Sequence, residues 1–300
     1  MDIFVQQLVN GLILGSIYAL IALGYTMVYG ILGLINFAHG EVVMIGAMIC
    51  ITCLNLLIGN GSDLSPLLLI GASVLMAVPA CALLGYGIER IAYRPLRKAP
   101  RLAPLITAIG VSIVLQNLAM IIWGRQYVPF PAIFTNQPLQ FLGASITPLQ
   151  VSIMVLAALM MGGLLLLVQK TRLGRAMRAT ALDHEAAFVL GVDINRIYAL
   201  TFSFGSALGG LAGVLVGLYY NAVYPTMGAM MGLKAFSACI LGGLGSVPGA
   251  VIAALALGEA ENLAVAYLGS GYRHVLSFAI LILALLFWPQ GLFGRKEQVR

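Results

Sequence analysis

Long apolar runs recur along the whole chain and leave little room for a water-soluble fold. They span residues 8–30, 42–58, 66–87, 104–123, 148–168, 198–220 and 274–288. About 20 apolar residues form a helix long enough to cross the hydrocarbon core of a bilayer. Only 9% of the 300 residues are charged, against about 25% in soluble domains. The sequence therefore predicts an all-α polytopic membrane protein with about 8 transmembrane helices, in a range of about 7–10.

The positive charges are concentrated in two loops and the C-terminal tail, which hold thirteen of the 16 Lys and Arg residues. These are Arg90, Arg94, Arg97, Lys98 and Arg101 in the first loop, Lys170, Arg172, Arg175, Arg178 and Arg196 in the second, and Arg295, Lys296 and Arg300 in the tail. Loops rich in Lys and Arg stay on the cytoplasmic side of a membrane. Both loops and the C-terminus are therefore predicted to be cytoplasmic, and the net charge of +6 needs no nucleic-acid partner.

The same charge pattern orders the loops around the membrane. Two apolar runs separate the two cytoplasmic loops, so the proline-rich stretch 124–147 between these runs is predicted to lie outside. Three simple spans before the first basic loop imply an N-terminus on the outer side. That side stays open, because residues 33–41 form either a surface loop or a half-membrane segment.

Polar side chains interrupt the apolar sequence at Asn36, His39 and Glu41. Such residues are costly in hydrocarbon unless they face a cavity or a partner. We therefore assign all three to a translocation pathway. The alternatives are a buried, hydrogen-bonded histidine at position 39 and a glutamate at position 41 that stabilises a helix N-terminus.

A second interruption lies in residues 233–262. Residues 233–244 form about 18 Å of helix, too short to cross about 30 Å of hydrocarbon, and the sequence GGLGSVPG then breaks any helix. We predict a discontinuous or re-entrant pair of segments that meet at this break. Two short spans joined by a tight turn are the alternative. Transporters place substrate sites at broken helices. The further pathway candidates are Gly242, Gly243, Gly245 and Gly249.

Four glycines recur every fourth residue within the run 198–220. They are Gly205, Gly209, Gly213 and Gly217. On a helix they form one smooth stripe, on which another backbone packs closely. The stripe predicts either a sliding interface that lines a pathway or static helix packing.

The second basic loop is predicted to hold a short amphipathic helix over Arg175–Leu190. Its apolar positions are Ala179, Leu182, Ala186 and Leu190, spaced by three or four residues. Glutamate and arginine side chains would lie on the exposed side, and Gly191 would end the helix as a C-cap. A solvated surface helix without a partner is the alternative.

Several segments resemble the permeases of ABC importers for branched-chain amino acids, specifically the shorter of their two permease subunits. They are NGLILGSIYALIALGYTMVYGILGLINFAHGEVVMIGA (Asn10–Ala47), RPLRKAPRLAPLITAIGVS (Arg94–Ser112), TRLGRAMRATALDHEAAFVLGVD (Thr171–Asp193), KAFSACILGGLGSVPGAVIAALALGEAEN (Lys234–Asn262) and FWPQGLFGR (Phe287–Arg295). The resemblance covers nearly the whole chain. INFAHGE and GGLGSVPGA are the motifs most specific to this group.

The resemblance implies one transmembrane domain over residues 1–300 in a bacterial inner membrane. It implies a second homologous permease, two ATP-binding subunits and a periplasmic binding protein for Leu, Ile and Val as partners. It also implies that the loop of about residues 170–197 couples transport to an ATPase. The coupling residues would be Arg178, Glu185, Ala186, Ala187 and Gly191.

Other functions are weighed against this hypothesis. A permease for urea or short amides belongs to the same family, and a stand-alone channel or secondary transporter also uses broken helices and glycine stripes. A membrane enzyme needs a nucleophile with a base, or a metal motif such as H-E-x-x-H, and neither occurs. The chain also has no G-x-x-x-x-G-K-[ST] phosphate-binding loop. We therefore expect no catalysis, metal or cofactor on this chain, and ATP hydrolysis on its partners.

Overall fold

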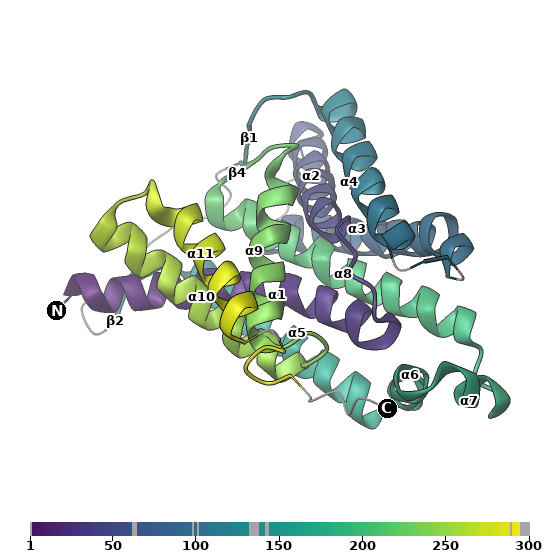
Figure 1. Cartoon of the computed structure of the whole chain (residues 1–300). Coiled ribbons are helices and arrows are strands. Elements are labelled where there is room, and N and C mark those ends of the chain that lie inside the picture. Colours follow the sequence, from purple (N-terminus) through teal and green to yellow (C-terminus); the bar gives the residue numbers. More distant parts are fainter. Residues whose placement is uncertain are drawn as a thin grey trace. The chain divides into compact units, whose positions relative to one another are not determined.

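The computed structural model describes residues 2–61, 65–97, 99–100, 102–131, 138–141, 144–288 and 290–294. The basic residues Lys98, Arg101, Arg295, Lys296 and Arg300, and parts of the stretch 124–147, lie outside the described residues. The described chain is mainly helical (Figure 1). This confirms the all-α membrane fold.

The helices follow the apolar runs closely. They are α1 (Asp2–Leu32), α2 (His39–Gly59), α3 (Pro66–Ile88), α4 (Leu102–Trp123), α5 (Pro148–Lys170), α6 (Arg172–Leu182), α7 (His184–Val189), α8 (Ile194–Tyr220), α9 (Met227–Gly242), α10 (Val247–Leu268) and α11 (Tyr272–Phe287). A π-helical turn, η1 (Glu89–Tyr93), and a 3-10 turn, η2 (Arg94–Leu96), follow α3. The short strands are β1 (Val128–Pro129), β2 (Leu139–Phe141), β3 (Ala144–Ile146) and β4 (Ala222–Val223).

Among the described residues, seven helices are long and apolar enough to cross a membrane: α1, α2, α3, α4, α5, α8 and α10. The helices α9 and α11 are shorter, with 16 residues each. At 1.5 Å per residue, 16 residues span about 24 Å, less than the roughly 30 Å of a hydrocarbon core. The predicted break after α9 is confirmed at residues 243–246. However, α10 has 22 residues, so it is long enough to cross, and only α9 is too short to cross in this pair.

The chain divides into two compact units. The first comprises Met1–Thr26, Thr135–Gly163 and Leu233–Arg300, and the second Met27–Phe134 and Leu164–Gly232. The helices α1, α5 and α9 contribute residues to both units. The single domain expected from the resemblance stays a prediction.

The second unit is built around α2, α3 and α8, which pack against one another. Its core contains the buried residues Val28, Ala38, Val42, Cys81, Ile88, Tyr93, Ala108, Leu115 and Phe202. Only 22% of the most apolar window of α3, and 17% of that of α4, is buried. Their remaining apolar side chains are suited to contact lipid.

Two loops of the second unit join through a short antiparallel ladder between β1 and β4. Val128 pairs with Val223 and Pro129 with Ala222, and the Phe130 amide donates to the Asn221 carbonyl at 2.9 Å. The Tyr127 and Tyr224 rings lie 4.5 Å apart. The stretch that begins at residue 124 and the loop 221–226 are therefore one connected surface.

The first unit packs α1 against α10 through glycines. A methyl group added at Gly15 would lie 2.7 Å from Leu255 Cα, and one added at Gly11 would lie 2.8 Å from Glu259 Cα. Such close backbone approach is typical of helix pairs in membranes. In the same unit α10 also packs against α11, and the two lie side by side in Figure 1.

Candidate functional site

The predicted coupling loop, residues 170–197, folds as two helices rather than one. The structure corrects the expected helix Arg175–Leu190, because α6 ends at Leu182 and α7 starts at His184. Asp183 separates them with extended backbone, and its carboxylate accepts from the amides of Glu185 at 2.9 Å and Ala186 at 3.0 Å. These hydrogen bonds hold the Asp183 pKa below its ordinary value. An aspartate that caps the next helix offers the backbone an alternative to continuing the first one.

Gly191 ends α7 as predicted. Its φ of +85° is in the left-handed region, which favours glycine. The Gly191 amide donates to the Phe188 carbonyl, and the Val192 amide donates to the Ala187 carbonyl. This pair of bonds is a Schellman motif. The chain therefore turns sharply and enters α8 three residues later.

Apolar side chains at the end of α6 and in α7 face outward, whereas Met177 within α6 is buried. Leu182, Phe188, Val189 and Leu190 are 82%, 69%, 84% and 81% exposed. Glu185 and Ala186 are also exposed, whereas Ala187 is buried. An exposed apolar patch with a polar border marks a surface for another protein or for a membrane. The α7 segment therefore has the chemistry of a docking element.

Arg178 anchors α6 to the end of α5. Its Nη1 donates to the carbonyls of Val168 at 2.9 Å and Gln169 at 3.2 Å. Carbonyls of a last helical turn have no partner within their own helix, and a basic side chain satisfies them. The structure thus gives Arg178 a contact within this chain, and its assignment to ATPase coupling stays a prediction.

A cavity of about 260 Å³ lies beside the junction of α6 and α7. Its wall consists of Tyr29–Gly33 at the end of α1, Thr180–His184 at the junction, and Tyr198 of α8. The coupling loop therefore borders the segment in which Gly33, with φ of +66°, interrupts the first helix.

Asn36, His39 and Glu41 lie together in the second unit, and all three are buried. The Asn36 side-chain oxygen accepts from the Ala38 amide at 3.1 Å and from the Tyr93 hydroxyl at 3.2 Å. A methyl group added at Gly209 would lie 2.9 Å from the His39 ring. These contacts place both side chains within packed protein.

Glu41 lies in the first turn of α2, as the helix-stabilising alternative expects. Its Oε1 accepts from the Ser112 hydroxyl at 3.3 Å. Among the described residues its Oε2 has no hydrogen-bond partner, which is uncommon for a buried polar atom. A methyl group added at Gly228 would lie 2.6 Å from that oxygen. The pathway assignment of Asn36, His39 and Glu41 remains a prediction.

Gly242, Gly243, Gly245 and Gly249 lie at the break between α9 and α10, within the first unit. Gly243 and Gly245 have φ of +97° and +87°, and Ser246 caps α10 by accepting from the Gly249 amide. The C-terminal segment packs on this break: the amides of Leu292 and Phe293 donate to the carbonyls of Leu241 at 2.8 Å and Gly242 at 3.1 Å. The chain itself thus satisfies carbonyls of the interrupted backbone, and a pathway role for these glycines stays a prediction.

The glycine stripe of α8 is a contact surface within the second unit. Gly205, Gly209, Gly213 and Gly217 are all buried. A methyl group added at Gly213 would collide with the Val43 carbonyl of α2, and one added at Gly217 would lie 2.6 Å from the Phe130 ring. The stripe therefore brings α2 close to α8, as static packing requires.

Sequence reasoning missed the charged residues Lys234 and Glu261, whose side chains form a buried ion pair in the first unit. A lysine in one apolar segment and two glutamates, Glu259 and Glu261, in the next are the signal that points to such a pair.

Comparison with known proteins adds to these observations. The family described as the permease component of branched-chain amino acid transport systems matches residues 7–285. The chain is 47% identical over 298 residues to the high-affinity branched-chain amino acid transport system permease protein LivH of Salmonella typhimurium, covering 98% of this chain and 96% of that one.

Two further relatives have the same extent. The corresponding permease protein BraD of Pseudomonas aeruginosa is 47% identical over 98% of this chain and 97% of its own. A probable branched-chain amino acid transport permease protein of Methanocaldococcus jannaschii is 30% identical over 98% of this chain and 94% of its own. The chain is a membrane-embedded transport protein that belongs to the family of permease components of branched-chain amino acid transport systems.

Proposed function

We propose that this chain is a transmembrane subunit of an ATP-driven importer that carries leucine, isoleucine and valine into the cell. The observation that carries the proposal is 47% identity to permeases named for branched-chain amino acids, over 98% of the chain. The apolar composition suits the aliphatic side chains of these substrates, because transfer of apolar surface out of water is favourable.

The importer contains, in this proposal, a second homologous permease, two ATP-binding subunits and a periplasmic amino-acid-binding protein. The segment that contains Glu185, Ala186, Ala187 and Gly191 docks on an ATP-binding subunit. The exposed Phe188, Val189 and Leu190 support this, because apolar side chains at that exposure suit burial in a partner's groove. ATP is hydrolysed by the partners.

Loaded binding protein docks on the opposite side, at the surface formed by the β1 and β4 loops. The ladder between these loops and the Tyr127–Tyr224 ring contact support a preformed platform. Movement of the ATP-binding subunits acts on α7 and through α6 and α8 on the helices that follow. Such coupling requires that the ATPase contacts the two transport states differently.

The protein lies in the bacterial inner membrane in this proposal, with both basic loops and the C-terminus in the cytoplasm. The Lys and Arg distribution supports this orientation. The coupling loop then faces the compartment that holds ATP.

The first test is a mild-detergent purification of the tagged chain from its native membrane, with mass spectrometry of co-eluting proteins. We expect a second permease and two ATP-binding subunits. Reconstituted with the binding protein in liposomes, the complex should hydrolyse ATP faster with leucine, isoleucine or valine than with urea or acetamide. A chain that elutes alone and transports without ATP would refute the proposal.

Charge reversal of the coupling residue sharpens this test. Glu185→Lys changes an exposed side chain without touching the described core. We expect leucine uptake to fall by at least about tenfold, as for loss of a charged interface contact, at an unchanged amount of protein in the membrane. Normal uptake by the Glu185→Lys variant would remove the assignment of this residue.

A further inference from the structure

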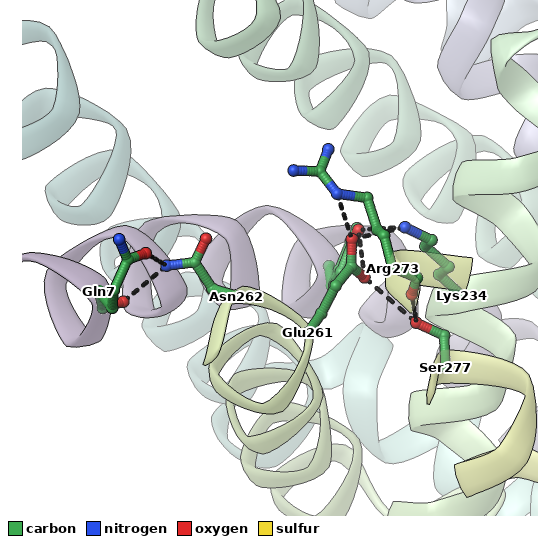
Figure 2. A network of polar contacts seen from close by, with 7 residues as sticks. Gln7, Lys234, Glu261, Asn262, Arg273 and Ser277 are labelled. Carbon is green, nitrogen blue, oxygen red and sulfur yellow. Dashed lines mark hydrogen bonds and ion pairs between the residues drawn. The ribbon is translucent and has the colours of Figure 1, made fainter. Parts of the chain in front are cut away.

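Glu261 is the centre of a buried polar network that joins four helices of the first unit (Figure 2). Its Oε1 accepts from Lys234 Nζ of α9 at 2.6 Å. Its Oε2 accepts from the Tyr18 hydroxyl of α1 at 3.0 Å and from the Ser277 hydroxyl of α11 at 3.2 Å. Lys234 Nζ also donates to the Tyr18 hydroxyl at 3.2 Å. The helices α1, α9 and α11 thus each contribute a donor to this one carboxylate of α10.

The pair is fully enclosed, with side-chain exposures of 1% for Lys234 and 0% for Glu261. Removal of one partner from such a pair leaves an uncompensated buried charge, which is strongly destabilising. Between membrane helices there is no hydrophobic driving force, so polar contacts and close packing determine how they associate. The position of the short helix α9 against α10 therefore depends on this pair.

A second cation stands beside the same carboxylate. Arg273 Nε of α11 lies 3.6 Å from Glu261 Oε1, and its side chain is 33% exposed. That nitrogen makes no hydrogen bond to any described residue. The cluster of Lys234, Glu261 and Arg273 thus has two positive charges for one negative charge. Glu261 has a neighbouring cation available if Lys234 moves away.

We propose that Lys234 and Glu261 position α9, and that Arg273 replaces Lys234 on Glu261 when α9 moves during transport. The break that follows α9 contains Gly243 and Gly245, and glycine adopts φ of either sign at low cost, so a change of backbone conformation is least costly there. The exchange keeps the buried carboxylate compensated in both arrangements. The exchange of Arg273 for Lys234 during transport rests on the proposed function. The compensation of Glu261 by Lys234 and Arg273 does not depend on it.

Cys239 reports the position of α9. It lies five residues after Lys234, is fully buried, and its Sγ is 3.2 Å from the Ala22 carbonyl of α1. In a variant with Cys50, Cys53 and Cys81 changed to Ala, N-ethylmaleimide labelling of this chain measures the exposure of Cys239. In the liposome-reconstituted complex we expect protection at rest and at least about tenfold faster labelling during ATP turnover, as for opening of a buried contact.

Arg273→Gln separates exchange from a static ion pair. The resting contact between Lys234 and Glu261 is intact in this variant, so membrane amount and resting protection of Cys239 should equal wild type. Uptake and turnover-linked labelling should both fall by about fivefold or more, as for loss of a hydrogen-bonded charge partner. Arg94→Gln, an exposed arginine in the first basic loop, is the matched control and should change neither.

The thermal stability of purified variants at Lys234 and Glu261 tests the charge compensation directly. The Glu261→Gln variant should be less stable than the Lys234→Met variant. In Glu261→Gln the buried Lys234 has no counter-charge, whereas in Lys234→Met the carboxylate of Glu261 still has Arg273 beside it. Adding Arg273→Gln should destabilise Lys234→Met strongly. The double variant Lys234→Met/Glu261→Gln should recover much of the stability that either single change loses.

The outcomes distinguish this inference from the proposed function. A wild-type complex without ATP-driven uptake would refute the proposed function, while the stability of the charge variants would still decide whether the three charges are matched. ATP-driven uptake that Arg273→Gln leaves unchanged, or Cys239 labelling that is the same with and without ATP, would overturn the exchange.

Discussion

Gly191 has a backbone conformation that other residues adopt only with strain, and it lies next to the segment proposed to dock an ATPase. Its φ is +85°, and nothing lies within 4 Å of an added Cβ. Gly191→Val therefore acts through the backbone alone, at a cost of about 1–2 kcal/mol. Because the strain is concentrated at the end of α7, we expect leucine uptake to fall by at least about tenfold.

Gly61 provides a matched control for this substitution. It follows the C-cap of α2, has φ of +70°, and also has open space around an added Cβ. Gly61→Val should impose the same strain far from the coupling loop in sequence and leave uptake near wild type. Equal losses in both variants, measured at equal membrane amounts, would show that Gly191 has no special role.

Asp183 shapes the coupling loop, because its carboxylate accepts hydrogen bonds from two backbone amides at the start of α7. Asp183→Asn keeps a side-chain oxygen that accepts these amides, whereas Asp183→Ala removes it. We therefore expect uptake to be highest in wild type, lower in the Asp183→Asn variant and lowest in the Asp183→Ala variant. An Ala variant as active as wild type would contradict the capping role.

The pH dependence of this cap has a definite sign. The folded pKa of Asp183 lies below the ordinary value of 3.8. The stability that the ionised Asp183 cap contributes to the fold is therefore complete above pH 3.8. It is lost as the pH falls through the lower pKa of the folded state. The difference in uptake between the Asp183→Ala variant and wild type should consequently stay constant from about pH 6 to pH 8. A difference that disappears between pH 6 and pH 8 would show that a group other than the Asp183 carboxylate causes the loss of uptake.

The helix pair α2 and α8 depends on the absence of side chains at its crossing. A methyl group at Gly213 meets the Val43 carbonyl, whereas a methyl group at Gly110 of α4 meets nothing within 4 Å. Gly213→Ala should lower the melting temperature of the detergent-solubilised protein, because the two backbones must separate. Gly110→Ala should be neutral or raise it, because alanine favours a helix by about 1 kcal/mol over glycine.

This comparison also bears on the two interpretations of the glycine stripe. Static packing predicts that Gly213→Ala loses stability and uptake in proportion. A sliding interface predicts that uptake falls further than the loss of stability accounts for. The measurement of both quantities on one variant therefore decides between them.

The orientation of the whole chain follows from its loops, and cysteine labelling tests it. The four native cysteines are buried, so an introduced cysteine at an exposed position reports its own side of the membrane. Thr226→Cys should react with a membrane-impermeant maleimide in spheroplasts. Glu185→Cys should react only in inverted vesicles, where the cytoplasmic face is accessible. Both residues are exposed. The reverse pattern would invert the proposed topology.

The chain's membrane class, six of its seven long helices, the break near residue 244 and the glycine end of α7 follow from the sequence alone, whereas the full length of α10 does not. Each depends on neighbours in the chain: apolar runs, a cluster of glycines with a proline, or a residue free to adopt positive φ. The split of α6 and α7 at Asp183 was missed, because the local helical pattern continues through the aspartate, whose carboxylate competes for the backbone.

Tertiary structure alone decided which polar residues meet. Lys234 and Glu261 are 27 residues apart, and Lys234 and Tyr18 are 216 residues apart. No local pattern encodes such pairings, because they arise where helices cross. The same holds for the C-terminal amides that satisfy carbonyls at the break after α9. The sequence by itself determined which segments become helices, since hydropathy and turn chemistry act locally. Only packing decided which buried charges compensate one another, since that requires surfaces distant in the chain to come together.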